Sequence, residues 1–301
     1  MKLLRFIARL RSVDTGGLKG EDVRSKNAGV LKRLWAKRTA KLSIVILCGL
    51  VLTAIFAPHV SEYEYDVMDI PNRFQPPSRR HLFGTDEFGR DLLSRIAYGA
   101  RYTLQIGMIS VTISVSMGSL LGLMSGFFGG WADMIIMRFI ELMLAFPGLL
   151  LSLMVIAVLG PGLQNAMIAV GIGSMPDFAR LVRGSVLSIK EKEYIEAARA
   201  GGIRQASILF RHILPNTVSP VIVLATMRLP GAILSAAALS FIGLGAQPPI
   251  PEWGAILNSG RAHLRQAPWI TVFPGIAIML TVLAFNLLGN ELRDVLDPRL
   301  K

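Results

Sequence analysis

Long apolar stretches alternate with short polar segments from residue 42 almost to the end of the chain. An apolar run of about 20 residues is long enough to cross the hydrocarbon core of a bilayer as a helix. The pattern therefore predicts an all-α polytopic membrane protein with six transmembrane helices. The predicted spans are Leu42–Ala57, Tyr102–Phe128, Met134–Leu159, Leu163–Val182, Val218–Gly245 and Ile270–Gly289.

Three of these spans contain residues that disturb a regular helix. Asp177 and Arg180 shorten the fourth span at its C-terminal end. Proline has no N–H group to donate, so Pro220 and Pro230 predict a kinked or broken fifth span. For the same reason Pro147 predicts a kink in the third span.

The composition agrees with a membrane protein and excludes a soluble domain of this length. Of the 301 residues, 52% are hydrophobic and only 17% are charged. The single cysteine, Cys48 in the first span, excludes an internal disulfide and a metal site built from several cysteines.

Lys and Arg are distributed unevenly between the two sides of the predicted spans. Residues 1–41 hold twelve, residues 177–216 hold seven and the C-terminal tail holds three, against eight in the segments 58–101 and 246–267. The positive-inside rule therefore predicts that both termini and the 177–216 segment are cytoplasmic. Topology and anionic lipid account for most of the net charge of +12, so nucleic acid is not expected as a partner.

The predicted topology divides the chain into a cytoplasmic N-terminal tail, a first span with its external loop, a core of the remaining spans, and a cytoplasmic C-terminal tail. The corresponding residues are 1–41, 42–101, 102–289 and 290–301, with a cytoplasmic loop at 183–216 inside the core.

Several charged side chains fall inside predicted spans. Arg138 and Glu141 are three residues apart, so one helix face can bring them together. Arg228 lies between the two prolines of the fifth span and is costly in lipid unless it faces a cavity or another subunit. These residues are candidates either for a transport pathway or for a contact between subunits.

The four histidines do not predict a metal site. His59, His81, His212 and His263 are spread over both sides of the membrane, and no pair has the spacing of metal ligands.

The 183–216 loop contains the most informative pattern of the sequence. A short helix is expected to be followed by a glycine break and by a second helix that proline ends. Ala197 and Ala198 are good helix formers with little bulk, so their helix can enter a groove. Gly202 permits a positive φ, and Glu196 can meet a basic group of a partner. An ordinary surface helix with a glycine stop is the alternative.

The spacing of the whole loop resembles the EAA loop of the membrane subunits of bacterial ABC importers. That pattern is Glu-Ala-Ala, three residues, Gly, nine residues, and then Ile, any residue, Leu and Pro. The chain departs from it at one position, where His212 replaces Ile. The resemblance implies that the loop couples to an ATPase subunit through Glu193, Tyr194, Glu196, Ala197, Ala198, Gly202, His212, Leu214 and Pro215.

Three further stretches narrow the resemblance to the peptide and nickel branch of these importers, and to the second of its two permease subunits. The tail departs slightly, because relatives usually have Asp-Gly where this chain has Asn290-Glu291. The stretches are His81–Arg95, Phe241–Gly254 and Leu288–Arg299. In the first, Thr85 or Asp86 is expected to cap a helix.

This resemblance implies a type I ABC importer fold in the cytoplasmic membrane of a bacterium or archaeon. The implied partners are a second permease subunit in a heterodimer, two ATP-binding subunits, an extracytoplasmic substrate-binding protein, a peptide substrate and the lipid bilayer. No Gly-x-x-x-x-Gly-Lys-Ser/Thr run occurs in the sequence, so the chain is not expected to be an enzyme or to hold a cofactor. ATP and Mg are then bound by the partner subunits.

Three alternatives stay open for the function, of which a purely structural membrane subunit is the hardest to exclude by sequence. A nickel or other metal-chelate importer would use the same kind of permease. A secondary transporter belongs to another class, but should show paired intramembrane acids or an internal repeat, and neither is evident.

Overall fold

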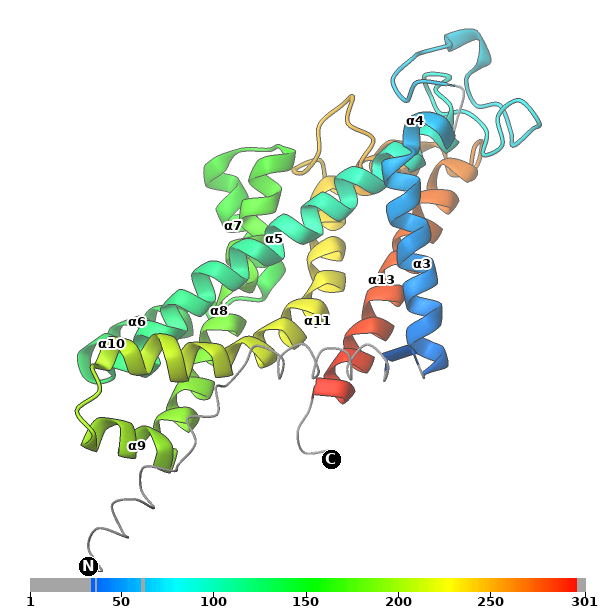
Figure 1. Ribbon diagram of the computed structural model, residues 1–301. Helices are drawn as coiled ribbons and strands as arrows, with labels where there is room; N and C mark the ends of the chain where they lie inside the picture. Colours follow the sequence, from blue (N-terminus) through cyan, green and yellow to red (C-terminus); the bar gives the residue numbers. More distant parts are fainter. Residues whose placement is uncertain (1–33, 36, 61–62, 297–301) are drawn as a thin grey trace, which may run out of the picture.

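The computed structural model describes residues 34–35, 37–60 and 63–296, and these residues form an all-α protein without β-strands. Figure 1 shows long helices leaning against one another, with α9 at one end and the loop after α4 at the other. The helices are α3 (Arg38–Ile55), α4 (Ala57–Val60), α5 (Leu92–Phe128), α6 (Gly130–Leu144), α7 (Gly148–Leu159), α8 (Leu163–Lys190), α9 (Glu193–Ala200), α10 (Gln205–Ile208), α11 (Leu214–Phe241), α12 (Trp253–Gly260) and α13 (Trp269–Leu296).

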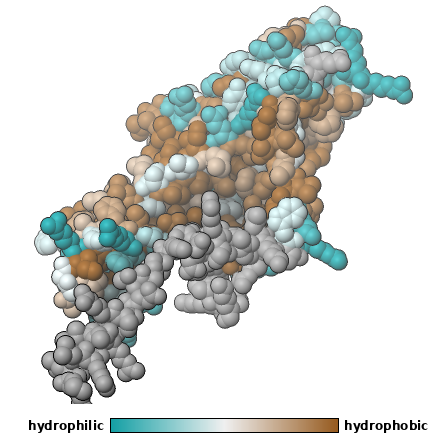
Figure 2. Space-filling model, viewed as in Figure 1, coloured by the Kyte–Doolittle hydropathy of each residue, from teal (hydrophilic) through white to brown (hydrophobic). Residues whose placement is uncertain are grey.

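Apolar and polar residues are distributed over the surface as expected for a membrane protein. In Figure 2 an apolar band covers the middle, and hydrophilic residues gather at the two ends. Among the described residues, four helical segments are long and apolar enough to cross a membrane: α3, α5, α13 and the continuous helix Gln205–Phe241. The pair α6 and α7 would make a fifth if it is taken as one span. The predicted number of six spans is therefore not confirmed.

The fourth predicted span is present as a helix but is less apolar than the others. It corresponds to α8, which continues beyond Val182 to Lys190. Gln164, Asn165, Asp177 and Arg180 lower its hydropathy, and much of its apolar surface is buried by neighbouring helices rather than exposed to lipid.

The third predicted span, Met134–Leu159, is broken rather than kinked. Its two halves, α6 and α7, meet at an angle of 97°. Pro147 lies at the break with ψ of 137°, outside the helical region, and begins α7 as its N-cap. Proline also pushes the residue before it away from helical geometry, which favours a break at this point.

The fifth predicted span behaves differently, because its prolines do not interrupt it. α11 is continuous through Pro220 and Pro230, and Figure 1 shows that it changes direction along its length, so the prediction of a kink is confirmed. The prediction that proline ends the second loop helix is wrong. Pro215 lies in the first turn of α11, directly after a wider π-helical turn at Leu209–Ile213. The helix nevertheless continues from Gln205 to Phe241, because the wider turn displaces the backbone hydrogen bonds at the point where Pro215 has no N–H to donate.

The most extensive helix contact among the described residues is between α5 and α8. Gly118, Gly122 and Gly126 recur every four residues along one face of α5. A Cβ atom on Gly118 would lie 2.5 Å from the carbonyl oxygen of Met175, and one on Gly126 would lie 2.8 Å from the Cβ of Val186. Only glycine therefore permits this approach, as in other helix pairs packed through small residues.

Two serines extend the same face of α5 toward its N-terminal half. The Ser110 hydroxyl donates to the carbonyl oxygen of Met167 at 2.9 Å, and the Ser114 hydroxyl donates to that of Gly171 at 2.7 Å. These hydrogen bonds join the helices where no water competes for the carbonyl groups.

Helix α3 is attached to the rest of the molecule at both ends. At its start, Lys37 forms ion pairs with Glu291 and Asp294 of α13. At its end, Arg101 of α5 donates to the carbonyl oxygens of Ala54 and Ile55. A cation at the C-terminal end of a helix satisfies carbonyl groups that have no partner inside the helix.

The loop before α5 is held by buried charges, and its capping residue differs from the prediction. Asp91, rather than Thr85 or Asp86, caps α5 by accepting from the backbone N–H of Ser94 at 2.8 Å. Asp86 instead forms a buried ion pair with Arg90 at 2.6 Å. The predicted helix thus begins at Leu92, because Asp86 is used to fold the turn before it.

The buried residue Glu252 is the N-cap of the short helix α12, which lies between α11 and α13 in the chain. It accepts from the backbone N–H of Ala255 at 3.1 Å. Burial raises the pKa of Glu252, because the charged form loses its hydration. The next residue, Trp253, donates from its indole to the carbonyl oxygen of Ile96 at 3.0 Å, which fixes this loop to α5.

The α5–α8 contact can be tested with Gly122→Leu. The new side chain would meet the backbone of Ala179 and Arg183, so we expect the variant to lose about 1–3 kcal/mol of stability. Thermal unfolding of the detergent-solubilised chain measures the loss. Gly184→Leu on α8 is the control, because a Cβ there has no neighbour within 4 Å. Equal melting temperatures for the two variants would show that the helices do not need this close approach.

Candidate functional site

The predicted coupling loop is mostly helical. Residues 183–190 belong to α8 and residues 214–216 to α11, so the connection between the two long helices is residues 191–213. In Figure 1, α9 and the turn after it project from one end of the molecule.

One face of α9 holds the helix to the body of the protein and the other is exposed. Ile195 and Ala198 are buried in an apolar cluster with Val182 and Val186 of α8. Ile208 and Ile213, which follow in the chain, complete the cluster. Of the two alanines that were predicted to enter a partner's groove, only Ala197 is exposed, because Ala198 is used inside the chain.

The glycine pair after α9 closes the helix in a defined geometry. The N–H of Gly202 donates to the carbonyl oxygen of Arg199, and the N–H of Ile203 donates to that of Ala198. This is the Schellman arrangement, which requires a left-handed residue. Gly202 has that conformation, with φ of +75°, and a Cβ there would have no neighbour within 4 Å. The turn is therefore both rigid and open to a partner.

The remaining residues of the pattern also lie on the surface. Glu193, Tyr194, Glu196, Leu214 and Pro215 are exposed, and His212 is half-buried. The rings of Tyr194 and His212 lie with centroids 6.4 Å apart, so the two halves of the loop meet across the turn.

The acidic side chains of α9 have no partner in the described part of this chain. Neither Glu193 nor Glu196 forms an ion pair or side-chain hydrogen bond among the described residues, and both lie in the first turn of the helix. Carboxylates there are favoured by the partial positive charge of the helix N-terminus. Glu196 is thus available to a basic group outside the chain.

A polar network connects the base of this loop to the membrane helices. Arg183 of α8 donates from Nε and Nη2 to the two carboxylate oxygens of Asp133 in α6, each at 2.6 Å. Ser125 of α5 donates to the same carboxylate. Lys190, at the end of α8, donates to the last carbonyl groups of α5. Three helices are therefore locked together where α8 leads into α9.

The sequence did not identify this network. Asp133 and Arg183 are 50 residues apart, so no local spacing relates them. The available signal was the cost of an isolated charge near an apolar span, which predicts that a partner exists but not which residue it is.

The predicted pair Arg138 and Glu141 does form, but on the surface of α6. The guanidinium and carboxylate groups are 3.4 Å apart, and the side chains are 76% and 59% exposed. An exposed pair of this kind contributes little to stability.

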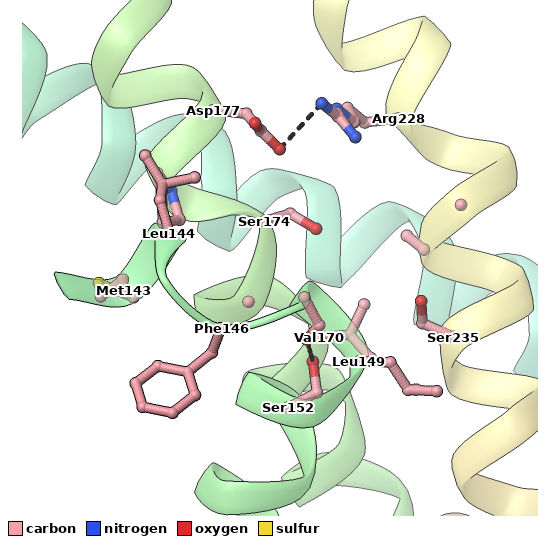
Figure 3. Close-up of a pocket in the computed structure, with 15 residues that line it drawn as sticks. Met143, Leu144, Phe146, Leu149, Ser152, Val170, Ser174, Asp177, Arg228 and Ser235 are labelled. Atoms are coloured by element: carbon pink, nitrogen blue, oxygen red, sulfur yellow. Dashed lines mark hydrogen bonds and ion pairs between the residues drawn. The ribbon is translucent and has the colours of Figure 1, made fainter. Parts of the chain in front are cut away.

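Arg228 has an acidic partner that is distant in sequence. Its Nη2 atom lies 2.9 Å from Oδ2 of Asp177 in α8. Figure 3 shows this ion pair at one side of a cavity between the α6–α7 break, α8 and α11. The cavity has a volume of about 270 Å³, and Ser152, Ser174 and Ser235 also line it. The partner was missed because only tertiary structure brings α8 and α11 together.

The described residues include no group of three His, Cys, Asp or Glu side chains that could hold a metal ion.

The two ion pairs of α6 should differ in their effect on stability. Asp133→Asn removes charge from two short hydrogen bonds, so we expect a loss of about 1.5–3 kcal/mol. Arg138→Gln removes an exposed pair and should cost about 1 kcal/mol or less. Thermal unfolding of the solubilised chain compares them. A larger loss for Arg138→Gln would contradict the assignment of the network.

Comparison with known sequences agrees with the geometry. The profile of the family described as binding-protein-dependent transport system inner membrane component matches residues 118–301. The profile of the N-terminal TM domain of oligopeptide transport permease C matches residues 28–77.

Similar proteins cover nearly the whole chain. The dipeptide transport system permease protein DppC of Alkalihalophilus pseudofirmus is 49% identical over 270 residues, which are 90% of this chain and 89% of the relative. The glutathione transport system permease protein GsiD of Pectobacterium atrosepticum is 45% identical over 285 residues, which are 93% and 95% of the two chains.

Solved structures show the same fold. An inward-facing MetNI methionine ABC transporter has a TM-score of 0.54 and 21% identity, over 67% of this chain and 96% of that chain. An amino acid ABC transporter with histidines has a TM-score of 0.51 and 19% identity, over 65% and 91%. The resemblance found in the sequence is thereby confirmed. The chain is a multi-pass membrane permease of the ABC transporters, and it belongs to the family of binding-protein-dependent transport system inner membrane components.

Proposed function

We propose that this chain is the second permease subunit of an ATP-driven importer of peptides. It pairs with a different permease subunit, binds two ATP-hydrolysing subunits and receives its substrate from an extracytoplasmic binding protein. The observation that carries the proposal is segment 193–215, which keeps the EAA spacing, exposes Glu196, Ala197 and Gly202, and is fixed to α8 through the buried side chains of Ile195 and Ala198.

The loop supports a docking role for mechanical reasons. A partner that binds the exposed residues of α9 and moves them also moves α8, because Ile195 and Ala198 pack against that helix. On the other side of the turn the chain continues as one helix from Gln205 to Phe241. Closing of the ATPases on nucleotide would therefore be transmitted to α8 and α11 as movements of rigid elements.

We assign the contact with the ATPase to the exposed residues of the pattern, which are Glu193, Tyr194, Glu196, Ala197, Gly202, Leu214 and Pro215. The buried Ala198 contributes by holding α9 against α8. ATP and Mg bind to the partner subunits, because the sequence contains no phosphate-binding glycine loop. Hydrolysis is then the work of those subunits. The exposed pair Arg138 and Glu141 is assigned to the contact with the second permease.

The orientation follows from the charges together with the arrangement of the helices. The start of α3, the end of α13 and α9 lie toward one end of the molecule in Figure 1. Most of the Lys and Arg residues flank these ends. We therefore place this side in the cytoplasm of a bacterium or archaeon, and the loop before α5 outside.

Peptide is the cargo that the relatives support best. Those described above are named for dipeptide and glutathione transport, and glutathione is itself a peptide. A metal-chelate importer and a secondary transporter have less support, since neither is named among these relatives.

The coupling assignment is tested with Gly202→Asp. The substitution places a charged side chain in open space at the docking face, so it should remove ATPase binding and lower peptide uptake by about tenfold or more while the chain stays in the membrane. Co-purification of the ATPase subunits and ATP-dependent peptide uptake measure the two effects.

Gly160→Asp is the control for an aspartate at a glycine with positive φ outside the docking face. Gly160 also has a positive φ, +86°, and a Cβ there also has no neighbour within 4 Å, but it lies between α7 and α8 at the end opposite α9. The control should keep its ATPase subunits. Normal uptake by Gly202→Asp, or equal loss in both variants, would refute the docking role.

A further inference from the structure

The ion pair between Asp177 and Arg228 occupies a special position in the fold. Each residue lies at the middle of a 28-residue helix, α8 and α11 respectively. These are also the two helices that enter and leave the 191–213 loop. The ion pair therefore joins α8 and α11 near their midpoints, and these are the two helices that the proposed ATPases would move.

The ion pair is only partly buried. The Arg228 side chain is 45% exposed and that of Asp177 is 24% exposed, and both line the cavity in Figure 3. Arg228 lies in a helix that is long and apolar enough to cross the membrane, and a charge there is costly unless it faces a polar cavity or a functional partner. By contrast, Asp133 and Arg183 use both carboxylate oxygens in short hydrogen bonds at a helix end.

The contact leaves most of the bonding capacity of the two groups unused. Among the described residues it joins Nη2 of Arg228 to Oδ2 of Asp177 only. A guanidinium has five N–H donors, and a carboxylate has two acceptor oxygens. A ligand with both an anionic and a cationic group can thus bind to the pair without leaving either charge without a partner.

The charges and the size of the cavity limit the ligand. A lone anion would be repelled by Asp177 and a lone cation by Arg228, whereas a zwitterion matches both. The volume of about 270 Å³ lies just below the range of typical small-molecule sites, roughly 300–1,000 Å³, so the ligand must be small. The space suits a dipeptide or the end of a longer peptide. The Ser152 hydroxyl already donates to backbone carbonyl groups of α7 and α8, whereas the hydroxyls of Ser174 and Ser235 can bond to peptide groups.

We propose that the cavity between α7, α8 and α11 binds short peptides with free ends, holding the α-carboxylate at Arg228 and the α-ammonium group at Asp177. This inference rests on the proposed function, since it places the cargo of that importer in this chain. Movement of α8 against α11 changes the distance between the two charges. Binding and release of the peptide are thereby linked to the loop.

The test uses the full chain with whatever subunits co-purify, in lipid nanodiscs and without the binding protein. Binding of tritium-labelled alanyl-phenylalanine is measured at equilibrium. Arg228→Gln and Asp177→Asn should each weaken binding by about tenfold or more, as expected when a charge-assisted hydrogen bond is lost. The same peptide with an acetylated N-terminus and an amidated C-terminus should not compete.

The double variant Asp177→Asn/Arg228→Gln separates binding from a structural role. It removes both charges, so neither is left without its partner, and the fold should be nearly as stable as the wild type. We expect it to keep its melting temperature but not to bind the peptide. Asp294→Asn, at the end of α13 and outside the cavity, is the control that should bind normally.

Wild-type binding by the double variant, or competition by the capped peptide, would overturn the inference, as would a wild-type chain that does not bind. Co-purification of ATPase subunits is read in the same preparation. If no ATPase subunits co-purify, the proposed function is contradicted. If they co-purify and the variants still bind the peptide normally, only the assignment of the peptide site is refuted.

Discussion

The fold depends above all on the close approach of α5 and α8. Lipid offers no hydrophobic force between helices, so their association depends on tight packing and on hydrogen bonds. Glycines at 118, 122 and 126 let the backbones meet, and Ser110 and Ser114 bond to the carbonyl groups of α8. Both polar arrangements proposed for function use α8, so they depend on this contact.

α8 has two functional roles along its length. Near its middle, Asp177 reaches across to Arg228 of α11. Toward its end, Arg183 bonds to Asp133, and Val182 and Val186 pack against α9. A helix with this many polar and packed sites cannot also be uniformly apolar. This explains why the helix that was least convincing as a membrane span is central to the proposed mechanism.

The loop between α8 and α11 combines rigidity with exposure. The Schellman turn at Gly202 fixes the direction of the chain, while its open side has no intramolecular neighbour. Glu196 and Tyr194 are exposed near the start of α9. A surface that is rigid before binding pays little conformational entropy when a partner docks.

The sequence by itself determined the helical class, the positions of most long helices and the exposed loop, because apolar length, proline, glycine and local spacing act over a few residues. It also predicted the contact of Arg138 with Glu141, which are one helical turn apart. Only the tertiary structure decided that Ala198 is buried, that Pro147 breaks its helix while Pro230 does not, and that Asp177 is the partner of Arg228. Each of these depends on which helices pack together, and helices distant in sequence carry no local signal of their partners.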